Sequence, residues 1–132
     1  MFKKFILLFI VQLFIITPSI SMEKETTFNK KLFDKAQSEG KIVIVSSWIK
    51  YCSSCASQMK VLNNAKNDGK LFDIKFDNIE YFSFDVTNKD IANLFNVKFQ
   101  TTLLIFKNNN EVYRSLGETT EDLIYEALKK AI

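Results

Sequence analysis

Histidine is absent from this chain of 132 residues, and cysteine, glycine and proline are scarce, with two, three and one residues respectively. Without an imidazole, every mechanism that needs a histidine base and every metal site that needs a histidine ligand is excluded. Two cysteines also fall short of the four ligands of a structural zinc site, so the sequence predicts no metal centre. The 47% apolar content indicates a folded chain with room for one domain.

The N-terminal residues have the three-part layout of a secretory signal peptide. Lys3 and Lys4 precede an apolar run over residues 5–16, and the small residues Ser19 and Ser21 form a cleavage site. The alternative is an uncleaved membrane anchor, but this run is shorter than the about 20 apolar residues that a spanning helix needs. We therefore expect an exported protein, periplasmic after cleavage, or membrane-anchored if the segment is retained.

Cleavage after residue 21 would leave residues 22–132 as the functional domain. It removes Lys3 and Lys4 and no acidic residue, so 16 basic residues face 15 acidic ones and the net charge is +1. A nucleic-acid site or an anionic membrane surface needs clustered lysine and arginine. The balanced charge therefore argues against nucleic acid as a partner.

Apolar periodicity predicts alternating helices and strands, which are typical of an α/β fold. Helices are expected over residues 27–39, 52–67, 87–95 and from residue 119 or 120 to the end, with Thr87 as the cap of the third. Strands are expected over residues 41–47, 81–86, 102–107 and 111–116, the last two as a hairpin. Residues 70–80 are expected to form a loop with a partly helical piece. This order predicts a three-layer sandwich, in which helices flank a mixed sheet of about four strands.

The segment Cys52-Ser53-Ser54-Cys55 follows a predicted buried strand and begins a predicted helix. Unpaired N–H groups and the positive end of the helix dipole stabilise a thiolate there, so Cys52 should have a lowered pKa and act as the nucleophile. Cys55, one turn further, would resolve the mixed disulfide. A purely structural disulfide is the alternative, although a bond that closes so small a loop restricts the unfolded chain little.

These residues resemble the thioredoxin family, and the resemblance covers nearly all of residues 22–132. The segment from Trp48 to Cys55 is similar to the family motif Trp-x-x-Trp-Cys-x-x-Cys, with Tyr51 in the second tryptophan position. The strand 102–107 resembles the family strand that follows a cis-proline, and Gly117 falls where the family keeps a glycine. Residues 85–97 look most like the exported, membrane-linked reductase branch, such as the C-terminal domain of the Dsb electron-transfer protein.

The sequence departs from the family pattern at two positions. Thr101 stands in place of the cis-proline, and because a cis bond before a residue other than proline costs about 2.5–4 kcal/mol, we expect a trans or strained backbone there. Ser46 replaces the buried acid that cytosolic thioredoxins carry six residues before the first cysteine. Deprotonation of Cys55 must then depend on water or on another group.

The resemblance implies a thiol-disulfide oxidoreductase that acts on protein disulfides or thiols through Cys52 and Cys55. It implies no dissociable cofactor, a membrane thiol carrier as electron donor, and a monomer. The resemblance to the exported reductase branch implies a reductant, and Ser53 and Ser54 lack the histidine of strongly oxidising relatives. Trp48, Tyr51, Ser53, Ser54 and Thr101 are expected to surround the cysteines.

Several neighbouring residues leave alternatives open. Phe99 would line the substrate groove, whereas Lys50 and Lys60 either add positive potential near Cys52 or are ordinary surface lysines. The alternatives to an enzyme are a catalytically weak binding module that holds Cu(I) between its thiolates and a structural domain with an inert disulfide.

Overall fold

The computed structural model describes residues 24–132, and the predicted signal peptide lies outside them. The described residues form four helices and six strands, and the four helices and four of the strands match the predicted order. The helices are α1 (Lys30–Ser38), α2 (Ser53–Asp68), α3 (Lys89–Leu94) and α4 (Glu121–Ala131). The strands are β1 (Ile42–Trp48), β2 (Lys70–Leu71), β3 (Ile74–Lys75), β4 (Ile79–Asp85), β5 (Thr102–Lys107) and β6 (Asn110–Leu116).

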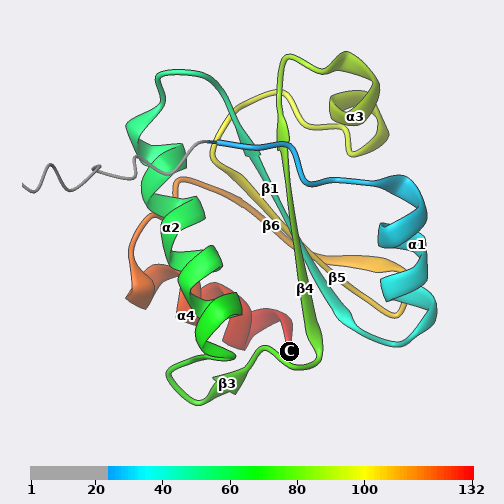
Figure 1. Ribbon diagram of the computed structural model, residues 1–132, viewed down its shortest axis with the longest axis vertical. Helices are drawn as coiled ribbons and strands as arrows, with labels where there is room; N and C mark the ends of the chain where they lie inside the picture. The colour runs from blue at the N-terminus through cyan, green and yellow to red at the C-terminus, as the bar shows by residue number, and fades with distance from the viewer. Residues whose placement is uncertain (1–23) are drawn as a thin grey trace, which may run out of the picture.

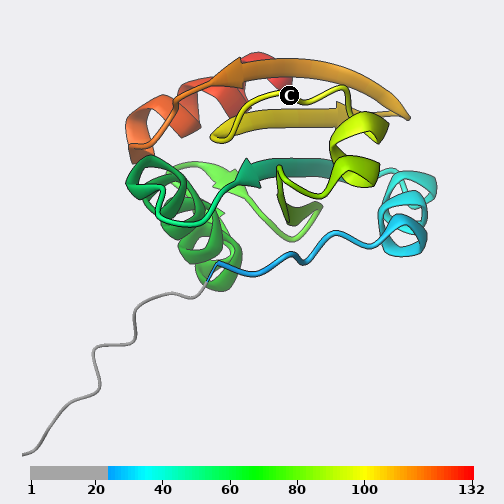
Figure 2. The same cartoon turned by 90° about the horizontal axis from the view of Figure 1, so that it is seen from above.

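The main sheet has four strands in the order β4-β1-β5-β6. β1 pairs in parallel with β4 and antiparallel with β5, and β5 forms an antiparallel hairpin with β6. In Figure 1 these strands cross the middle of the molecule, and Figure 2 shows helices on both sides of them. The predicted three-layer sandwich with a mixed four-strand sheet is confirmed.

β1 is the central strand because its alternating side chains enter both hydrophobic cores. Ile44 packs into the core beneath α2 and α4, which also contains Leu62 and Leu128. Val43 and Val45 pack into the opposite core, beneath α1 and α3. A strand that is buried on both faces reads as a continuous run of β-branched residues, as this one does.

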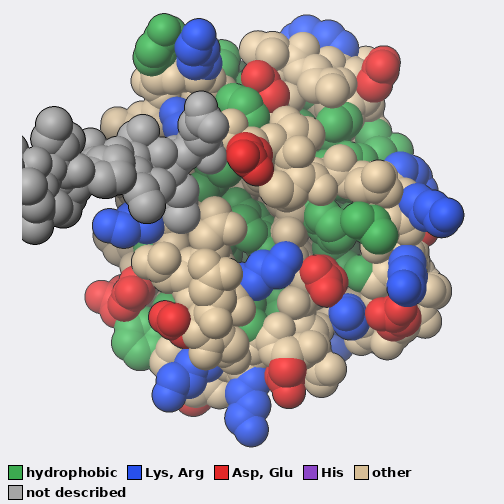
Figure 3. Space-filling model, in the orientation of Figure 1, with side chains coloured by type: hydrophobic (Ala, Val, Ile, Leu, Met, Phe, Trp, Pro, Cys, Tyr) green, Lys and Arg blue, Asp and Glu red, His purple; other side chains and the backbone are tan. Residues whose placement is uncertain are grey.

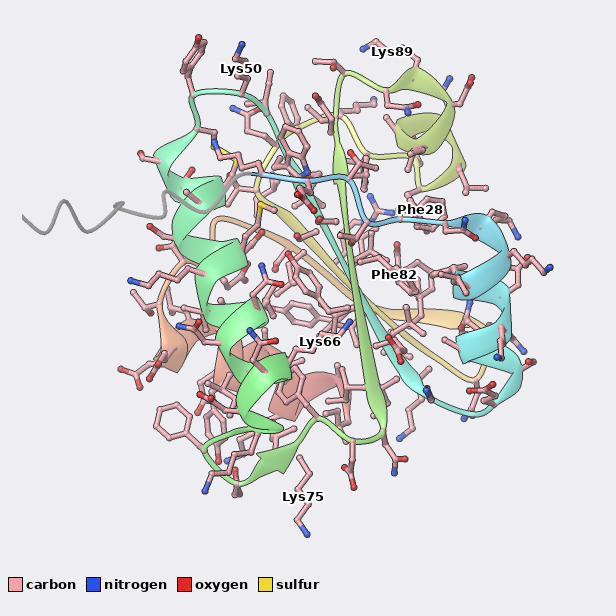
Figure 4. The ribbon with its side chains drawn as sticks, in the orientation of Figure 1. Phe28, Lys50, Lys66, Lys75, Phe82 and Lys89 are labelled. Carbon is pink, nitrogen blue, oxygen red and sulfur yellow. A yellow bond between two sulfur atoms is a disulfide. The ribbon has the colours of Figure 1, made fainter. Side chains whose placement is uncertain are left out.

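The core beneath α1 and α3 consists largely of aromatic rings. Phe28 and Phe82 point toward one another in Figure 4, with ring centroids 6.1 Å apart in an edge-on arrangement. The ring centroid of Phe33 lies 5.4 Å from that of Phe95 and 5.2 Å from that of Phe106. Edge-on ring pairs add favourable energy to the burial itself, so this cluster fixes α1 on the sheet.

Residues 70–80 differ from the expected loop with a helical piece. They form the short antiparallel hairpin β2-β3, in which Leu71 pairs with Ile74. Gly69 ends α2 at φ 71°, a left-handed conformation that suits glycine and turns the chain into the hairpin. The prediction of a helical piece is therefore wrong.

Two helices also begin later than their predicted starts at Thr27 and Thr87, and an asparagine caps each of them. Asn29 caps α1 and Asn88 caps α3, each by accepting a backbone N–H bond in its side chain. The two threonines hydrogen-bond elsewhere: the Thr27 hydroxyl accepts from the Ser83 backbone N–H, and the Thr87 hydroxyl donates to Asp85.

The segment that precedes α1 lies along the outer edge of β4. The backbone N–H groups of Thr27 and Phe28 both donate to the Ser83 carbonyl, and the Ser83 hydroxyl donates to the Glu25 carbonyl. Lys24 Nζ donates to the Ile49 carbonyl at 3.0 Å. These bonds cover a sheet edge that would otherwise present unpaired backbone groups.

No helix among residues 24–132 is both long and apolar enough to cross a membrane. On the face seen in Figure 3, lysine and arginine side chains are interspersed with aspartate and glutamate.

Candidate active site

Cys52 and Cys55 form a disulfide at the N-terminus of α2, with their Cα atoms 5.3 Å apart. Cys52 is the N-cap residue of the helix, and its Sγ accepts the Cys55 backbone N–H at 3.2 Å. Cys55 is fully buried, whereas Cys52 is partly exposed. An attacking partner can therefore reach the first sulfur and not the second.

Two hydroxyl groups lie against the sulfurs. Ser54 Oγ is 3.3 Å from Cys52 Sγ and 3.1 Å from Thr101 Oγ1. Thr101 Oγ1 is 3.2 Å from Cys55 Sγ and 3.6 Å from Cys52 Sγ. The site thus combines a helix N-terminus with side-chain donors for a developing thiolate.

Thr101 has a left-handed backbone, with φ 60°, and no peptide bond is cis within the part of the chain that the structure describes. The backbone is therefore trans, one of the two outcomes expected for threonine in place of the family proline. A β-branched residue in this region is an outlier that the surrounding structure must hold in place.

Three elements hold the Thr101 backbone. Its N–H donates to the Ser47 carbonyl of β1, and its carbonyl accepts from the Gly117 N–H, at 2.9 and 3.1 Å. The Gln58 side chain of α2 donates to the same carbonyl at 3.5 Å and to the Glu118 carbonyl at 2.9 Å. The loop that carries the hydroxyl is therefore tied to β1, to α2 and to the residues that follow β6.

Gln58 is a site residue that sequence reasoning missed. It is fully buried, and its Oε1 has no hydrogen-bond partner among the described residues. The available signal was its spacing, because residues three apart share one face of a helix and Gln58 follows Cys55 by three. A polar side chain on that face points toward the active-site loop.

The remaining predicted residues differ in their exposure to solvent. Trp48 ends β1 and is partly buried, and Ser53 is exposed in the first turn of α2. Tyr51 is 91% exposed, which leaves its ring free to contact a partner protein. Lys50 points away from the body of the protein in Figure 4, and its Nζ lies 5.1 Å from the Tyr51 ring centroid. Lys60 is exposed on α2.

Phe99 lines a surface hollow of about 350 Å³ beside the Thr101 loop. Leu116 of β6 lines the same hollow, and the two side chains are 59% and 58% exposed. The sequence singled out Phe99 but not Leu116, which reaches the hollow because it pairs with Thr102 in the sheet.

Ser46 lies beneath the site in a fully buried position, and its hydroxyl is 2.6 Å from the Tyr81 hydroxyl. Burial raises the pKa of Tyr81 well above its ordinary value, while the hydrogen bond with Ser46 opposes the shift. Ser46, hydrogen-bonded to the neutral Tyr81 phenol, therefore replaces the family's buried acid with a neutral hydroxyl. Neither is a proton acceptor for Cys55 at neutral pH.

No group of three or more histidine, cysteine, aspartate or glutamate side chains among residues 24–132 is arranged to hold a metal ion. The chemistry that the described site can perform is disulfide exchange. A partly exposed sulfur at a helix N-terminus can attack a disulfide, and the buried sulfur beside it can displace the product.

Comparison with known proteins finds a match to one family and similarity to several of its members. A model of the thioredoxin family matches residues 19–130. A thioredoxin of the H type from Fagopyrum esculentum is 25% identical over 100 residues, covering 75% of this chain and 79% of that protein. The crystal structure of Trxlp from Edwardsiella tarda matches with 27% identity and a TM-score of 0.64, covering 75% of this chain and 92% of the other. Fasciola hepatica thioredoxin matches with 19% identity and a TM-score of 0.63, covering 77% and 89%.

Proposed function

Because this chain belongs to the thioredoxin family and is a thiol-disulfide oxidoreductase, we propose that it works as an exported reductant of disulfides in other proteins. The observation that carries the proposal is the placement of Cys52. Its sulfur caps α2, is partly exposed, and is bonded to the buried Cys55.

The reaction has two exchange steps. In the reduced protein the Cys52 thiolate attacks one sulfur of a substrate disulfide, and the other substrate sulfur leaves with the electron pair and takes up a proton. Cys55 then attacks Cys52, which releases the second substrate sulfur as a thiol. The substrate disulfide is reduced to two thiols, and the Cys52–Cys55 pair is oxidised to a disulfide.

The direction of electron flow rests on sequence features. The residues between the cysteines are Ser53 and Ser54, and residues 85–97 resemble the exported reductase branch of the family. Export rests on the signal-peptide layout of residues 1–21. In an oxidising compartment the pair needs a continuous supply of electrons, so we propose a membrane thiol carrier as the donor and a monomer as the working form.

Cysteine variants test the proposed chemistry. Cys52→Ser should abolish the reduction of a disulfide-bonded protein such as insulin, because the exposed nucleophile is lost. Cys55→Ser should retain the attack but accumulate mixed disulfides, which non-reducing gels and mass spectrometry detect. If Cys52→Ser retains activity, or if the Cys55→Ser protein forms no mixed disulfide, the assignment of nucleophile and resolving thiol is wrong.

The reduction potential tests the direction separately. A potential near or below that of thioredoxin, about −270 mV, supports a reductant, whereas one near −120 mV belongs to an oxidant. Equilibration of the Cys52–Cys55 pair with glutathione buffers gives this value. A protein that turns over insulin but has an oxidising potential would keep the chemistry and refute the reductant role.

A further inference from the structure

The two hydroxyls beside the disulfide form a continuous path from one sulfur to the other. The path runs from Cys55 Sγ to Thr101 Oγ1 over 3.2 Å, and from there to Ser54 Oγ over 3.1 Å. Ser54 Oγ lies 3.3 Å from Cys52 Sγ. Every link is short enough for a hydrogen bond that involves an oxygen or a sulfur.

The path begins at the sulfur that must lose a proton in the resolving step, Cys55 Sγ, and its last hydroxyl, Ser54 Oγ, lies beside Cys52 Sγ, the atom that the substrate sulfur leaves. Cys55 must lose its proton as it attacks Cys52, and the substrate sulfur that leaves Cys52 must gain one. Ser46 and Tyr81 are neutral hydroxyls and offer no buried base, so the usual proton acceptor of the family is absent from its place. Thr101 Oγ1, by contrast, lies within hydrogen-bond distance of Cys55 Sγ.

We propose that Thr101 and Ser54 are catalytic residues that relay the proton of Cys55 to the sulfur leaving Cys52. The proposal rests on the proposed function, since it concerns its second exchange step. The Cys55 S–H gives its proton to Thr101 Oγ1, Thr101 gives its own to Ser54 Oγ, and Ser54 gives its own to the departing sulfur. The Cys55–Cys52 bond forms, the Cys52–substrate bond breaks, and both hydroxyls end neutral.

The surroundings of the relay support this role. The Thr101 side chain is buried, and its backbone is held by Ser47, Gly117 and Gln58, so the hydroxyl is fixed beside Cys55. Ser54 is exposed in the first turn of α2 and stands on the Cys52 side, where a substrate sulfur would be bonded. The unusual φ of 60° at Thr101 places this hydroxyl, which a proline could not supply.

The test compares Thr101→Val, which keeps the β-branched shape and removes the hydroxyl, with Thr101→Ser, which keeps the hydroxyl. Reduced protein is mixed with a small aliphatic disulfide, such as hydroxyethyl disulfide, and the mixed disulfide on Cys52 is followed by rapid acid quench and mass spectrometry. In the unsubstituted protein the mixed disulfide should resolve fast, with little pH dependence between pH 6 and 8. In Thr101→Val it should accumulate and resolve about 100-fold more slowly near pH 6.5, the usual scale of proton-transfer catalysis.

The pH profile separates a relay from a merely structural role. Without the relay, resolution of Thr101→Val should follow free ionisation of Cys55 and rise about tenfold per pH unit below its pKa. Ser54→Ala should show the same steep profile, and Thr101→Ser should keep the shallow one. The attack step, measured in a Cys55→Ser background, should change less than the resolving step in both variants.

The outcomes are distinguishable from those of the proposed function. If the unsubstituted protein forms no mixed disulfide and releases no thiol from hydroxyethyl disulfide, disulfide exchange itself fails. The relay is overturned if the unsubstituted protein forms and resolves a mixed disulfide and both Thr101→Val and Ser54→Ala resolve it with the same rate and pH profile. Melting curves verify that both variants are folded.

Discussion

Ser46 and Tyr81 form a neutral hydrogen bond where cytosolic thioredoxins have a carboxylic acid. Both residues are buried, on neighbouring parallel strands, and their hydroxyls are 2.6 Å apart. A buried hydroxyl that loses its partner costs about 1–3 kcal/mol, so each residue requires the other. The pair stabilises the sheet beneath the active site but gives no charge to the cysteines.

Because the Tyr81 phenol is buried, we expect the folded protein to lose stability at high pH. Burial raises its pKa above the ordinary value of 10.0, so the folded state keeps its proton while the unfolded chain loses it. The contribution of the protonated Tyr81 to the free energy of unfolding is fully present below pH 10. It decreases as the pH rises above 10, and the loss is about 1.4 kcal/mol at pH 11. Urea unfolding at pH 9 and 11 measures the decrease.

Tyr81→Phe is the matched variant for this effect. It should be less stable than the unsubstituted protein at pH 9, because Ser46 loses its partner, but the difference should shrink by pH 11. A difference that stays constant between the two pH values would show that ionisation of Tyr81 is not linked to folding. Comparison of the two proteins at each pH isolates the contribution of Tyr81.

At the residue scale, the sequence predicted the cysteine pair and its position at a helix start, because a short buried strand followed by helical periodicity leaves few alternatives. It did not predict that Thr101 and Ser54 would bridge the two sulfurs. Thr101 is 46 residues from Cys55 along the chain, and its hydroxyl reaches the site because the Thr101 backbone is left-handed. No local sequence pattern predicts that conformation.

At the scale of the elements, the packing of α1 on the sheet depends on few buried side chains. Phe33 and Ala36 are its buried residues, and the Phe33 ring contacts the rings of Phe28, Phe95 and Phe106. Phe33→Ala should therefore lower the free energy of unfolding by about 3–5 kcal/mol, as is typical of a buried aromatic residue. Denaturant unfolding measures the change.

Leu32→Ala is the matched control within the same helix. Leu32 is 52% exposed, so its truncation should change stability by no more than about 0.5 kcal/mol. Equal losses in the two variants would mean that the aromatic cluster does not hold α1 on the sheet.

The longer elements were predictable from sequence because their burial patterns repeat over several residues. The β2-β3 hairpin was not, since each strand has two residues and no periodicity can be read from two positions. Contacts distant in sequence hold it: the Phe72 ring lies 4.6 Å from the Tyr125 ring, and the Tyr125 hydroxyl donates to Asp73. The start of α1 was predicted too early for a similar reason, because Thr27 is held by β4, which is distant in sequence.

At the scale of the whole molecule, the signal-peptide layout predicts a shorter mature protein. When the full chain is expressed in cells that can export it, we expect a product that begins at Met22, because Ser19 and Ser21 fit the small-residue pattern of a cleavage site. Intact-mass measurement of the processed protein checks this. A product that retains residues 1–21 and fractionates with membranes would instead indicate an anchor.

The stability of the folded domain in its two redox states follows from the proposed direction of electron flow. Folding and reduction form a closed thermodynamic cycle, so a pair that is hard to reduce when folded must stabilise the folded disulfide form relative to the reduced form. Each 30 mV by which folding lowers the potential corresponds to about 1.4 kcal/mol of added stability. The short loop between Cys52 and Cys55 contributes little through chain entropy, so the difference reports on the active site.

A reductant should therefore unfold at a higher urea concentration when oxidised than when reduced. Unfolding curves with and without a dithiol reductant measure the difference, and the Cys52→Ser/Cys55→Ser double variant should give identical curves under both conditions. A reduced form that is the more stable of the two would mean that the folded site favours the thiolate of Cys52 over the disulfide. The protein would then be an oxidant, and the N–H and hydroxyl donors around Cys52 would be the physical cause.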